Sequence, residues 1–481
     1  MVDPNTLDAH AVAAAYRNGT TTPTEVVEHC LERIAAHNAT VGAFVTVTAD
    51  TAREQAAKAT ARFSEGSHQG LPTLFGVPTA IKDLNLTAGV RTMFGSATMT
   101  DFVPDVSDEV VRKIASAGLI SLGKTNTPEF GSPCYTEPDV APPARTPYDL
   151  TRSAGGSSGG AGAAVAAGLV PVAHGSDGGG SIRIPASVCG LVGLKPSRGR
   201  ISRAPIYGDI TGLSTSGPLA RTVRDAAALL DVMAGPTPGD ALWARELPGG
   251  QTYRDWCDRD PGTLRIARFA TPMITETAVA PEVLEAYDAM ADLLQRLGHT
   301  VAEVDSPMPP DAVAAFEIVW AVSANMSPVP PDKEHLLRPL SRWLRERGAR
   351  TSAPAFADAM LKMGQAGART IATLAPYDAV LTPTLAQLPA LVGGIRNDDD
   401  PASDFEAQKA FTPFTAAWNV TGMPAVSLPS GWSRDGLPIG TMLAARPGDE
   451  HVLCALGAQI EAACSDPDAP QRWRRPEIAL P

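Results

Sequence analysis

Apolar positions near the start of the chain recur at helical spacing. In the segment TPTEVVEHCLERIAAHN, Val26, Cys30 and Ile34 are each four residues apart, which places them on one face of a helix. Thr22 opens the segment as a candidate N-cap and Glu25 follows three residues later, the pattern of a capping box. We therefore predict helices from residue 6 to about residue 65 and assign this region to packing.

Between residues 71 and 235 the pattern changes. Short runs rich in β-formers alternate with Ala-rich stretches of helical character, and these runs are FGVPTAIKD, GLISLGKTN, LVPVAHGSD and CGLVGLKPS. Such alternation is typical of strands that are connected through helices, the arrangement of α/β proteins. The residues with candidate chemistry are concentrated in this part of the chain.

Residues 236–376 are rich in Pro, Trp and charged side chains. Amphipathic patterns predict helices at 282–297 and 336–348, and we interpret the region as a cover that shapes the substrate site. The acidic stretch at 396–400 is predicted to be a solvated loop. Strand-like runs return after residue 377, as YDAVLTPT and MPAVSLPS, and a last helix is predicted from about 449 to 463.

The chain contains no internal repeat, and strands return after the variable middle, so we predict one domain with an insertion. Its parts are a helical N-terminal region (1–70), a core (71–235), the variable region (236–376) and a C-terminal return to the core (377–481).

Composition narrows the class of protein. The 481 residues carry a net charge of −12 without a long basic run, which argues against nucleic-acid binding and favours a small-molecule partner. The six cysteines are scattered and show no zinc-ligand spacing, so neither a disulfide framework nor a metal site is predicted. The acidic N-terminus does not resemble a signal peptide, and no stretch of about 18 apolar residues is present. We expect a cytoplasmic protein without a membrane span.

Two serine clusters are embedded in glycine: AGGSSGGAG at 154–162 and SDGGGSIRIP at 176–185. Neither completes a Walker loop or a dinucleotide-binding loop. The first cluster fits the GxSxG of a nucleophile elbow, but that mechanism needs a histidine base, and the available histidines do not lie in segments that look catalytic. Ser121-Leu-Gly-Lys124 has SxxK spacing without the companion motifs of penicillin-binding enzymes, and chance accounts for it.

The glycines before Ser181 suggest a different chemistry. Acyl transfer needs backbone N–H donors that converge on an oxyanion, and consecutive glycines allow the close approach and the positive φ angles that this demands. A serine nucleophile also needs a base, and a lysine can serve if burial keeps it neutral. Lys82 ends an apolar strand-like run, where burial is expected, and is the candidate base.

Together, IKD at 81–83, GGSSGG at 155–160 and GSDGGGSIRIPAS at 175–187 resemble the amidase signature family of serine hydrolases. The segments GKTNTPEFG, GLKPSRGR and NVTGMPAVSLPSGWSRDGLPIG also resemble sequences of this family, so the resemblance spans most of the chain outside the variable region. It implies an α/β fold with a central mixed sheet that is covered on both faces by helices. It also implies hydrolysis of an amide C–N bond without a metal or an organic cofactor.

The resemblance also assigns roles to residues. Lys82 is implied as the base, Ser157 as a bridging serine after a cis Gly156–Ser157 peptide bond, and Ser181 as the nucleophile that forms the acyl-enzyme. The backbone amides implied to form the oxyanion hole are those of Gly178, Gly179, Gly180 and Ser181. Ser158 and Asp177 are expected to support this site through hydrogen bonds, and Arg183 is expected to form a structural ion pair.

The substrate is less defined. Glutaminase subunits of tRNA-dependent amidotransferases usually have Gln where this chain has Ile184, so that alternative is less favoured, and a non-catalytic binding scaffold should lack a triad residue. The DGGGS form is similar to that of bacterial hydrolases of the 6-aminohexanoate cyclic dimer, which suggests a small linear or cyclic amide. Gly178 stands where the family more often has a side chain. The expected partner is a small-molecule amide, and a homodimer is kept as an alternative to a monomer. Candidate pocket residues are Gly131, Cys134, Tyr135, Trp320, Trp418 and Asn419.

Overall fold

The computed structural model describes residues 8–65, 70–206, 208–465, 478 and 480, so residues 6 and 7 of the predicted helical region lie outside it. Its strands are β1 (Phe44–Val47), β2 (Pro78–Lys82), β3 (Ile120–Thr125), β4 (Val172–Asp177), β5 (Val192–Lys195), β6 (Thr215–Ala220), β7 (Arg265–Arg268), β8 (Thr300–Glu303), β9 (Ala379–Pro383), β10 (Ala425–Trp432) and β11 (Pro438–Ala445).

The α-helices are α1 (Ala9–Arg17), α2 (Pro23–Val41), α3 (Ala49–Ser64), α4 (Glu109–Ser116), α5 (Gly159–Ala166), α6 (Arg183–Val188), α7 (Val223–Met233), α8 (Tyr253–Trp256), α9 (Pro281–Arg296), α10 (Asp311–Asn325), α11 (Pro339–Ala349), α12 (Ala353–Leu374), α13 (Pro401–Phe411), α14 (Ala417–Thr421) and α15 (Glu450–Cys464). Short 3-10 helices lie at Ala97–Met99, Glu129–Gly131, Pro248–Gly250 and Pro331–Leu336.

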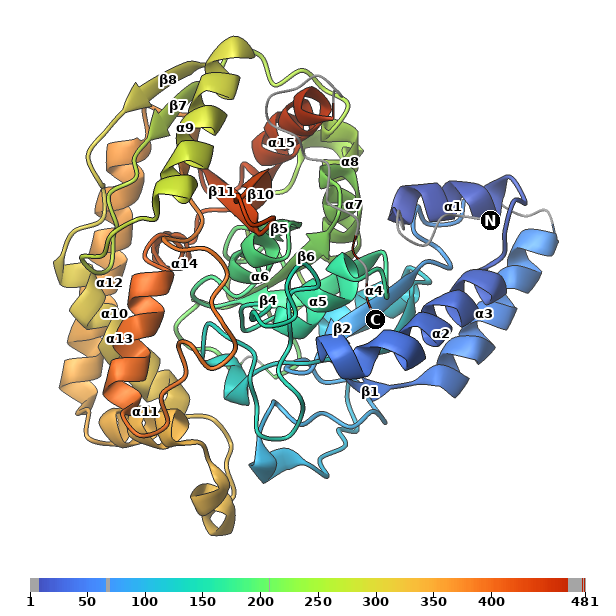
Figure 1. The fold of residues 1–481 in the computed structure, drawn as a ribbon, viewed down its shortest axis with the longest axis horizontal. Helices are drawn as coiled ribbons and strands as arrows, with labels where there is room; N and C mark the ends of the chain where they lie inside the picture. Colours follow the sequence, from blue (N-terminus) through green and yellow to red (C-terminus); the bar gives the residue numbers. More distant parts are fainter. Residues whose placement is uncertain (1–7, 66–69, 207, 466–477, 479, 481) are drawn as a thin grey trace.

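An eight-stranded mixed sheet forms the centre of the molecule, in the order β4-β6-β5-β10-β11-β9-β7-β8 (Figure 1). The pairs β7–β8 and β7–β9 are parallel. The pairs β4–β6, β6–β5, β5–β10 and β10–β11 are antiparallel. Helices flank the sheet, and α7, α8 and α15 pack together as one layer. The predicted α/β architecture with a helix-covered mixed sheet is confirmed.

A second sheet, in the order β1-β3-β2, lies beside the large one. The Thr79 hydroxyl on β2 donates to the carbonyl oxygen of Val172 on β4 (3.1 Å), which fixes the two sheet edges against each other. The last residue of β2 is Lys82 and the last of β4 is Asp177. The contact therefore brings the ends of two strands that carry predicted site residues into one region.

The N-terminal prediction is confirmed in its helices and wrong in one segment. The capping box of α2 is formed: the Thr22 hydroxyl accepts from the amide of Glu25 (3.2 Å), and the Glu25 carboxylate accepts from the amide of Thr22 (2.9 Å). Residues 44–47, however, form β1, which pairs antiparallel with β3. This FVTV segment is rich in β-branched residues, which favour a strand when a partner edge is available.

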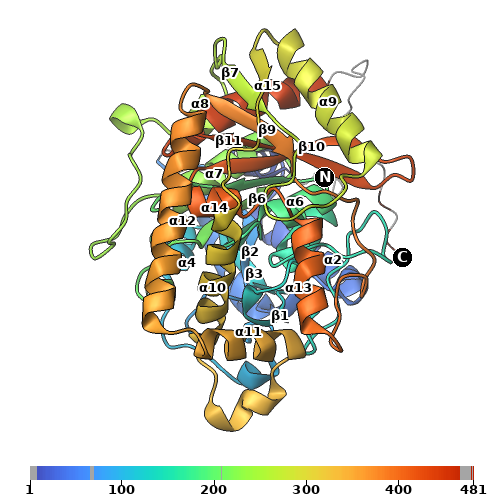
Figure 2. The ribbon, with the colours of Figure 1, turned by 90° about the vertical axis from the view of Figure 1, so that its left-hand side faces the viewer.

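The variable middle contributes to the central sheet, which the sequence pattern did not predict. β7 and β8 continue the sheet beyond β9, so the region adds two strands to the sheet besides its helices. The helices predicted at 282–297 and 336–348 are present as α9 and α11. Figure 2 shows α10, α12 and α13 in front of the sheet. The pair between Lys409 on α13 and Glu317 on α10 (2.6 Å) joins two of these helices.

The strands and the last helix predicted after residue 377 are present. β9, β10 and β11 are adjacent strands of the large sheet, and α15 covers β10 and β11. Residues 396–400 form a loop, although Asp398 is tied to the buried Arg338 by an ion pair (2.7 Å). Of the helices described here, none is both long enough and apolar enough to cross a bilayer.

Helix α5, which begins within the first serine cluster, depends on close backbone contact. A Cβ atom added to Gly160 would lie 2.3 Å from the amide nitrogen of Asn126 and 2.5 Å from the carbonyl oxygen of Ala43. These are backbone atoms, which cannot move aside as a side chain would. A matched glycine, Gly364 on α12, is exposed and has no atom within 4 Å of such a Cβ.

We predict opposite effects for the same substitution at these two glycines. Gly160→Ala should lower the free energy of unfolding by more than about 1 kcal/mol because of overpacking. Gly364→Ala should raise it by about 0.5–1 kcal/mol, because alanine loses less backbone entropy on folding. Chemical denaturation of both variants measures the difference, and equal effects would contradict the packing described for α5.

Candidate active site

Lys82 ends β2 with its side chain fully buried. Its Nζ donates to the Ser157 hydroxyl (2.8 Å) and to the carbonyl oxygen of Ser176 (3.2 Å). Burial lowers the pKa of Lys82 well below its usual range, although the negative charge of Asp177 opposes this shift. A lysine with a lowered pKa can be neutral near pH 7 and then has a lone pair for accepting a proton.

Ser157 lies between Lys82 and the cavity that opens at Ser181. The Gly156–Ser157 peptide bond is cis, as the resemblance implied. A Cβ on Gly156 would lie 2.7 Å from the amide nitrogen of Tyr135, so only glycine fits at this point of the turn. Ser157 is almost fully buried, yet it lines the same cavity as Ser181.

Ser181 follows β4 and precedes α6. It is 8% exposed, and its backbone carbonyl accepts from the amide of Ser158 (3.1 Å). Among the described residues, no hydrogen bond joins its hydroxyl to that of Ser157. Catalytic hydrogen bonds are often long in structures without substrate, and the shared cavity leaves both hydroxyls available to one reacting group.

The glycines before Ser181 form a tight turn over Asp177. The amide of Gly180 donates to the Asp177 carboxylate (2.8 Å), so this N–H does not point toward a substrate. Of the four amides predicted to form the oxyanion hole, those of Gly178, Gly179 and Ser181 remain. Gly180 has φ of 137°, and a Cβ there would lie 2.5 Å from the Thr415 hydroxyl. Both the backbone angle and the space require glycine.

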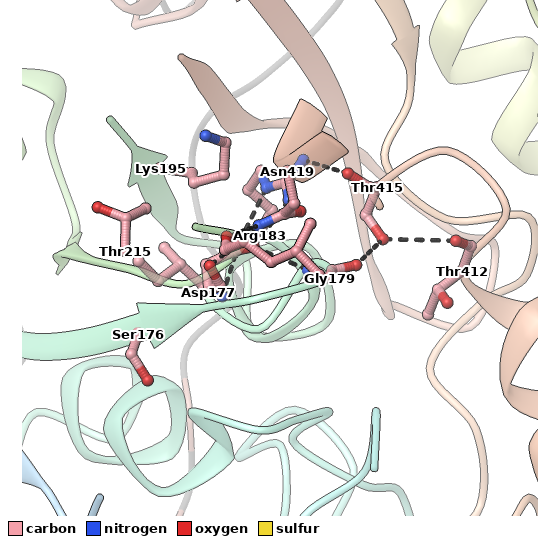
Figure 3. Close-up of polar contacts among 12 residues, drawn as sticks. Ser176, Asp177, Gly179, Arg183, Lys195, Thr215, Thr412, Thr415 and Asn419 are labelled. Atoms are coloured by element: carbon pink, nitrogen blue, oxygen red, sulfur yellow. Dashed lines mark hydrogen bonds and ion pairs between the residues drawn. The ribbon is translucent and has the colours of Figure 1, made fainter. Parts of the chain in front are cut away.

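The Asp177 carboxylate anchors this turn through a buried ionic cluster (Figure 3). Arg183 donates to it from Nε (2.9 Å) and Nη2 (2.8 Å), and the Asn419 amide donates to it at 2.9 Å. Burial alone would raise the pKa of Asp177, but the positive charge of Arg183 and the hydrogen bonds outweigh it and hold the pKa below its ordinary value. The expected structural ion pair of Arg183 is present, with both partners fully buried.

Ser158 supports the neighbouring strand. Its hydroxyl donates to the carbonyl oxygen of Ser176 (3.1 Å) and accepts from the amide of the same residue (3.2 Å). The Ser176 carbonyl therefore receives hydrogen bonds from both Ser158 and Lys82. This shared acceptor ties the first serine cluster to the end of β4.

The predicted pocket residues divide into two groups. Gly131, Cys134 and Trp320 line cavities that also contact Ser181. Tyr135, Trp418 and Asn419 do not line these cavities. The Tyr135 hydroxyl is buried against Asp404 (2.6 Å), Trp418 is fully buried in a hydrophobic cluster, and Asn419 belongs to the cluster around Asp177.

The sequence did not predict several residues that lie at the site. The Thr415 hydroxyl donates to the carbonyl oxygen of Gly179 (2.6 Å), a contact drawn in Figure 3. His174 accepts from the Lys82 amide at Nδ1 (3.4 Å), and burial lowers its pKa to about 3, with the charge of Lys82 adding to the effect. Phe316 stacks on Trp320 (5.3 Å between ring centroids). No local signal identifies these residues, because their contacts with Lys82 or with the turn before Ser181 join positions far apart in the sequence.

One group of potential metal ligands exists among the described residues: Asp8, His10 and Asp225. It lies where α1 meets α7, and none of its members lines a cavity shared with Ser181. The Asp225 carboxylate accepts from the amides of Ala9 (2.9 Å) and His10 (3.0 Å) and contacts His10 Nδ1 (2.6 Å). The fully buried carboxylate thus docks the start of α1.

The chain is similar to known proteins over most of its length. The sequence model of the amidase family matches residues 25–454. The chain belongs to the amidase family. Over 98% of its length it is 35% identical to a 6-aminohexanoate-cyclic-dimer hydrolase from Paenarthrobacter ureafaciens, of which 97% is covered.

Solved structures agree with this assignment. A structure of 6-aminohexanoate cyclic dimer hydrolase matches the amidase with a TM-score of 0.89 and 32% identity, over 99% of this chain and 100% of that one. A bacterial aryl acylamidase of the amidase signature family matches with a TM-score of 0.84 and 26% identity, over 95% and 96% of the two chains. The predicted family is confirmed, and the protein is a hydrolase of carbon–nitrogen bonds.

We predict that the amidase loses much of its stability when Asp177 is removed. Asp177→Ala should lower the free energy of unfolding by about 3–5 kcal/mol, because the buried Arg183 loses its charged partner. Denaturant titration measures this loss. A matched control is Asp358→Ala, which breaks the exposed pair with Lys362 and should have no measurable effect.

The loss should also depend on pH. Because the pKa of Asp177 is lowered in the folded chain, its stabilising contribution is complete above the pKa of an unfolded aspartate, about 4. Below that pH the unfolded chain takes up a proton that folded Asp177 does not, so the difference between wild type and Asp177→Ala should shrink. A difference that grew as the pH fell would contradict the assigned charge.

Proposed function

We propose that this amidase hydrolyses a small amide through an acyl-enzyme on Ser181, with Lys82 as the base and Ser157 as the bridge between them. The observation that carries the proposal is the buried Lys82 amine, 2.8 Å from a serine hydroxyl that lines the same cavity as Ser181. A lysine in such surroundings can act as a general base when it is neutral.

Acylation begins when the Ser181 hydroxyl attacks the amide carbonyl carbon. The new bond joins Ser181 Oγ to that carbon, while the Ser181 proton passes to Ser157 and the Ser157 proton passes to Lys82. The carbonyl oxygen becomes an oxyanion, and the amides of Gly178, Gly179 and Ser181 are the donors that would stabilise it. Preorganised donors of this kind stabilise the transition state because they need no reorientation as the charge develops.

Collapse of the tetrahedral intermediate breaks the C–N bond. The proton held on Lys82 returns through Ser157 to the nitrogen, because an amine leaves far more readily when it is protonated. Water then attacks the acyl-enzyme, gives up a proton to the same relay, and releases the carboxylic acid as Ser181 regains its proton. The residues named supply each proton transfer.

The substrate proposal comes from the relatives. The names of two similar proteins specify the 6-aminohexanoate cyclic dimer, and that of a third specifies an aryl acylamide. We propose a small linear or cyclic amide for this chain. A panel of primary aliphatic, aryl, peptide C-terminal and cyclic amides tests this range directly.

We predict that Ser181→Ala, Ser157→Ala and Lys82→Ala each lower kcat/KM by about 10³-fold or more, since residues that act as one unit fail together. Ser430→Ala is the matched control, because its hydroxyl donates to the carbonyl oxygen of Ile439 on a neighbouring strand, away from the relay. Circular dichroism checks the fold of each variant. Full activity in Ser181→Ala would refute the proposal.

The pH profile tests the base separately. Because Lys82 must be neutral and its pKa is lowered, log(kcat/KM) should rise through one deprotonation and reach its plateau well below pH 10.5, the ordinary lysine value. Lys82→Arg should be inactive at every pH, since a guanidinium does not lose its proton in proteins. Activity that still increases at pH 10 would exclude a buried neutral lysine as the base.

A further inference from the structure

We propose that Trp320 divides the substrate space at Ser181 into two arms, one for a neutral apolar acyl group and one for the departing amine. The inference rests on the proposed function, because it takes Ser181 as the nucleophile and Ser157 as the bridge. It adds which part of the substrate lies on which side, and names the residue that separates the two parts.

The two arms are separate cavities that meet at Ser181. The first is here called the acyl arm and the second the amine arm. Side chains that line the acyl arm include Ile274, Met308, Val313, Phe316, Phe405 and Val420. Those that line the amine arm include Ser157, Ser176, Asp209, Thr211, Ser214 and Ser323.

Trp320 lines both arms and is fixed between them. Its indole N–H donates to the Ser132 hydroxyl (3.2 Å), and its ring stacks on Phe316 at an interplanar angle of 21°. A Cβ on Gly178 would lie 3.6 Å from the indole, which is ordinary contact. Trp320 therefore lies over the turn before Ser181.

The position of Ser157 sets the direction of the substrate. Ser157 lines the amine arm and is absent from the described lining of the acyl arm. The bridging hydroxyl must deliver its proton to the leaving nitrogen, so this nitrogen has to lie on the Ser157 side. The acyl substituent of the carbonyl carbon then points past Trp320 into the other arm.

Charge in the acyl arm is already paired. The charged residues that line it, Glu317 and Lys409, form an ion pair with each other (2.6 Å). Glu317 also contacts Arg347 (3.4 Å), and Lys409 also contacts Glu406 (2.7 Å). An acyl group with a charged end would enter an apolar space without a free counter-ion, which is unfavourable. The arm therefore selects a neutral chain or ring.

The test uses fluorophosphonates, which report on Ser181 without knowledge of the natural substrate. Ser181 Oγ forms a bond to phosphorus, the P–F bond breaks, fluoride leaves, and the serine proton passes through Ser157 to Lys82. Probes with a methyl, an octyl or an ω-carboxyoctyl group on phosphorus are compared by their rates of labelling, and mass spectrometry identifies the modified residue. The octyl probe should react at least about tenfold faster than the other two, because the apolar chain gains favourable burial.

Two variants locate the effect, each with a matched control. Val313→Trp should fill the acyl arm and reduce the octyl-to-methyl rate ratio at least about tenfold, whereas Ala314→Trp, at an exposed neighbouring position of α10, should leave the ratio unchanged. Trp320→Ala should reduce the ratio at least about threefold, because the wall between the arms is lost. Trp432→Ala removes a tryptophan of similar partial burial from β10, where its ring packs on Tyr148 (4.8 Å between ring centroids), and should leave the ratio unchanged.

The outcomes separate this inference from the proposed function. If no probe labels Ser181, the proposed nucleophile is wrong and the two arms lose their basis. If Ser181 is labelled at equal rates by all probes, or if the Val313→Trp ratio equals that of wild type, the nucleophile stands and the two-arm assignment is overturned. The comparison of probes on the wild-type chain decides the matter even if a variant fails to fold.

Discussion

The carboxylate of Asp177 is the fixed point around which the site is built. It ends β4, accepts the Gly180 amide, and holds both Arg183 and the Asn419 amide in the protein interior. A buried charge is tolerated only when its oxygens are fully engaged, and here the engagement comes from the turn, from α6 and from α14, elements up to 242 residues apart. The position of Ser181 is thereby determined by an interaction that cannot shift without leaving a charge unpaired.

The Asp177 carboxylate also affects the pKa of Lys82, the proposed base, in the direction opposite to that of burial. Burial lowers the pKa of Lys82, whereas the negative charge of Asp177 raises it. Arg183 interacts with that carboxylate more strongly than Lys82 does, because two of its nitrogens donate to it directly. Because the carboxylate is largely neutralised by Arg183, Lys82 is left with burial as the dominant influence. The ion pair therefore supports both the turn that carries the nucleophile and the neutral state of the lysine.

Sequence reasoning predicted the parts of the site that are encoded in contiguous motifs. Lys82 at the end of an apolar run and Ser181 after a glycine run carry their signal in local residue types. The bridging role of Ser157 and the cis bond before it were implied by the family resemblance. Sequence reasoning could not predict Thr415 or Phe316, because each reaches the turn through contacts of more than 130 residues in sequence separation. β7 and β8 were missed because RIAR and TVAE are four-residue strands with polar ends, and only pairing along the sheet makes them strands.

The residues that select the shape of the substrate and the residues that react with it lie in different parts of this fold. The reacting groups lie on segments between residues 82 and 181, which are held by strand ends and a buried ion pair. The walls of the acyl arm come mainly from α10, α13 and the segment before α14. Figure 2 shows α10 and α13 as neighbouring helices, and the ion pair between Glu317 and Lys409 joins them. The two parts meet where Trp320 lies on Gly178. A Cβ at 178 would make ordinary contact with the indole (3.6 Å), so the catalytic turn and α10 are direct neighbours at this point. Changes in substrate range could therefore arise on α10 without disturbing the relay, provided that this single contact is kept.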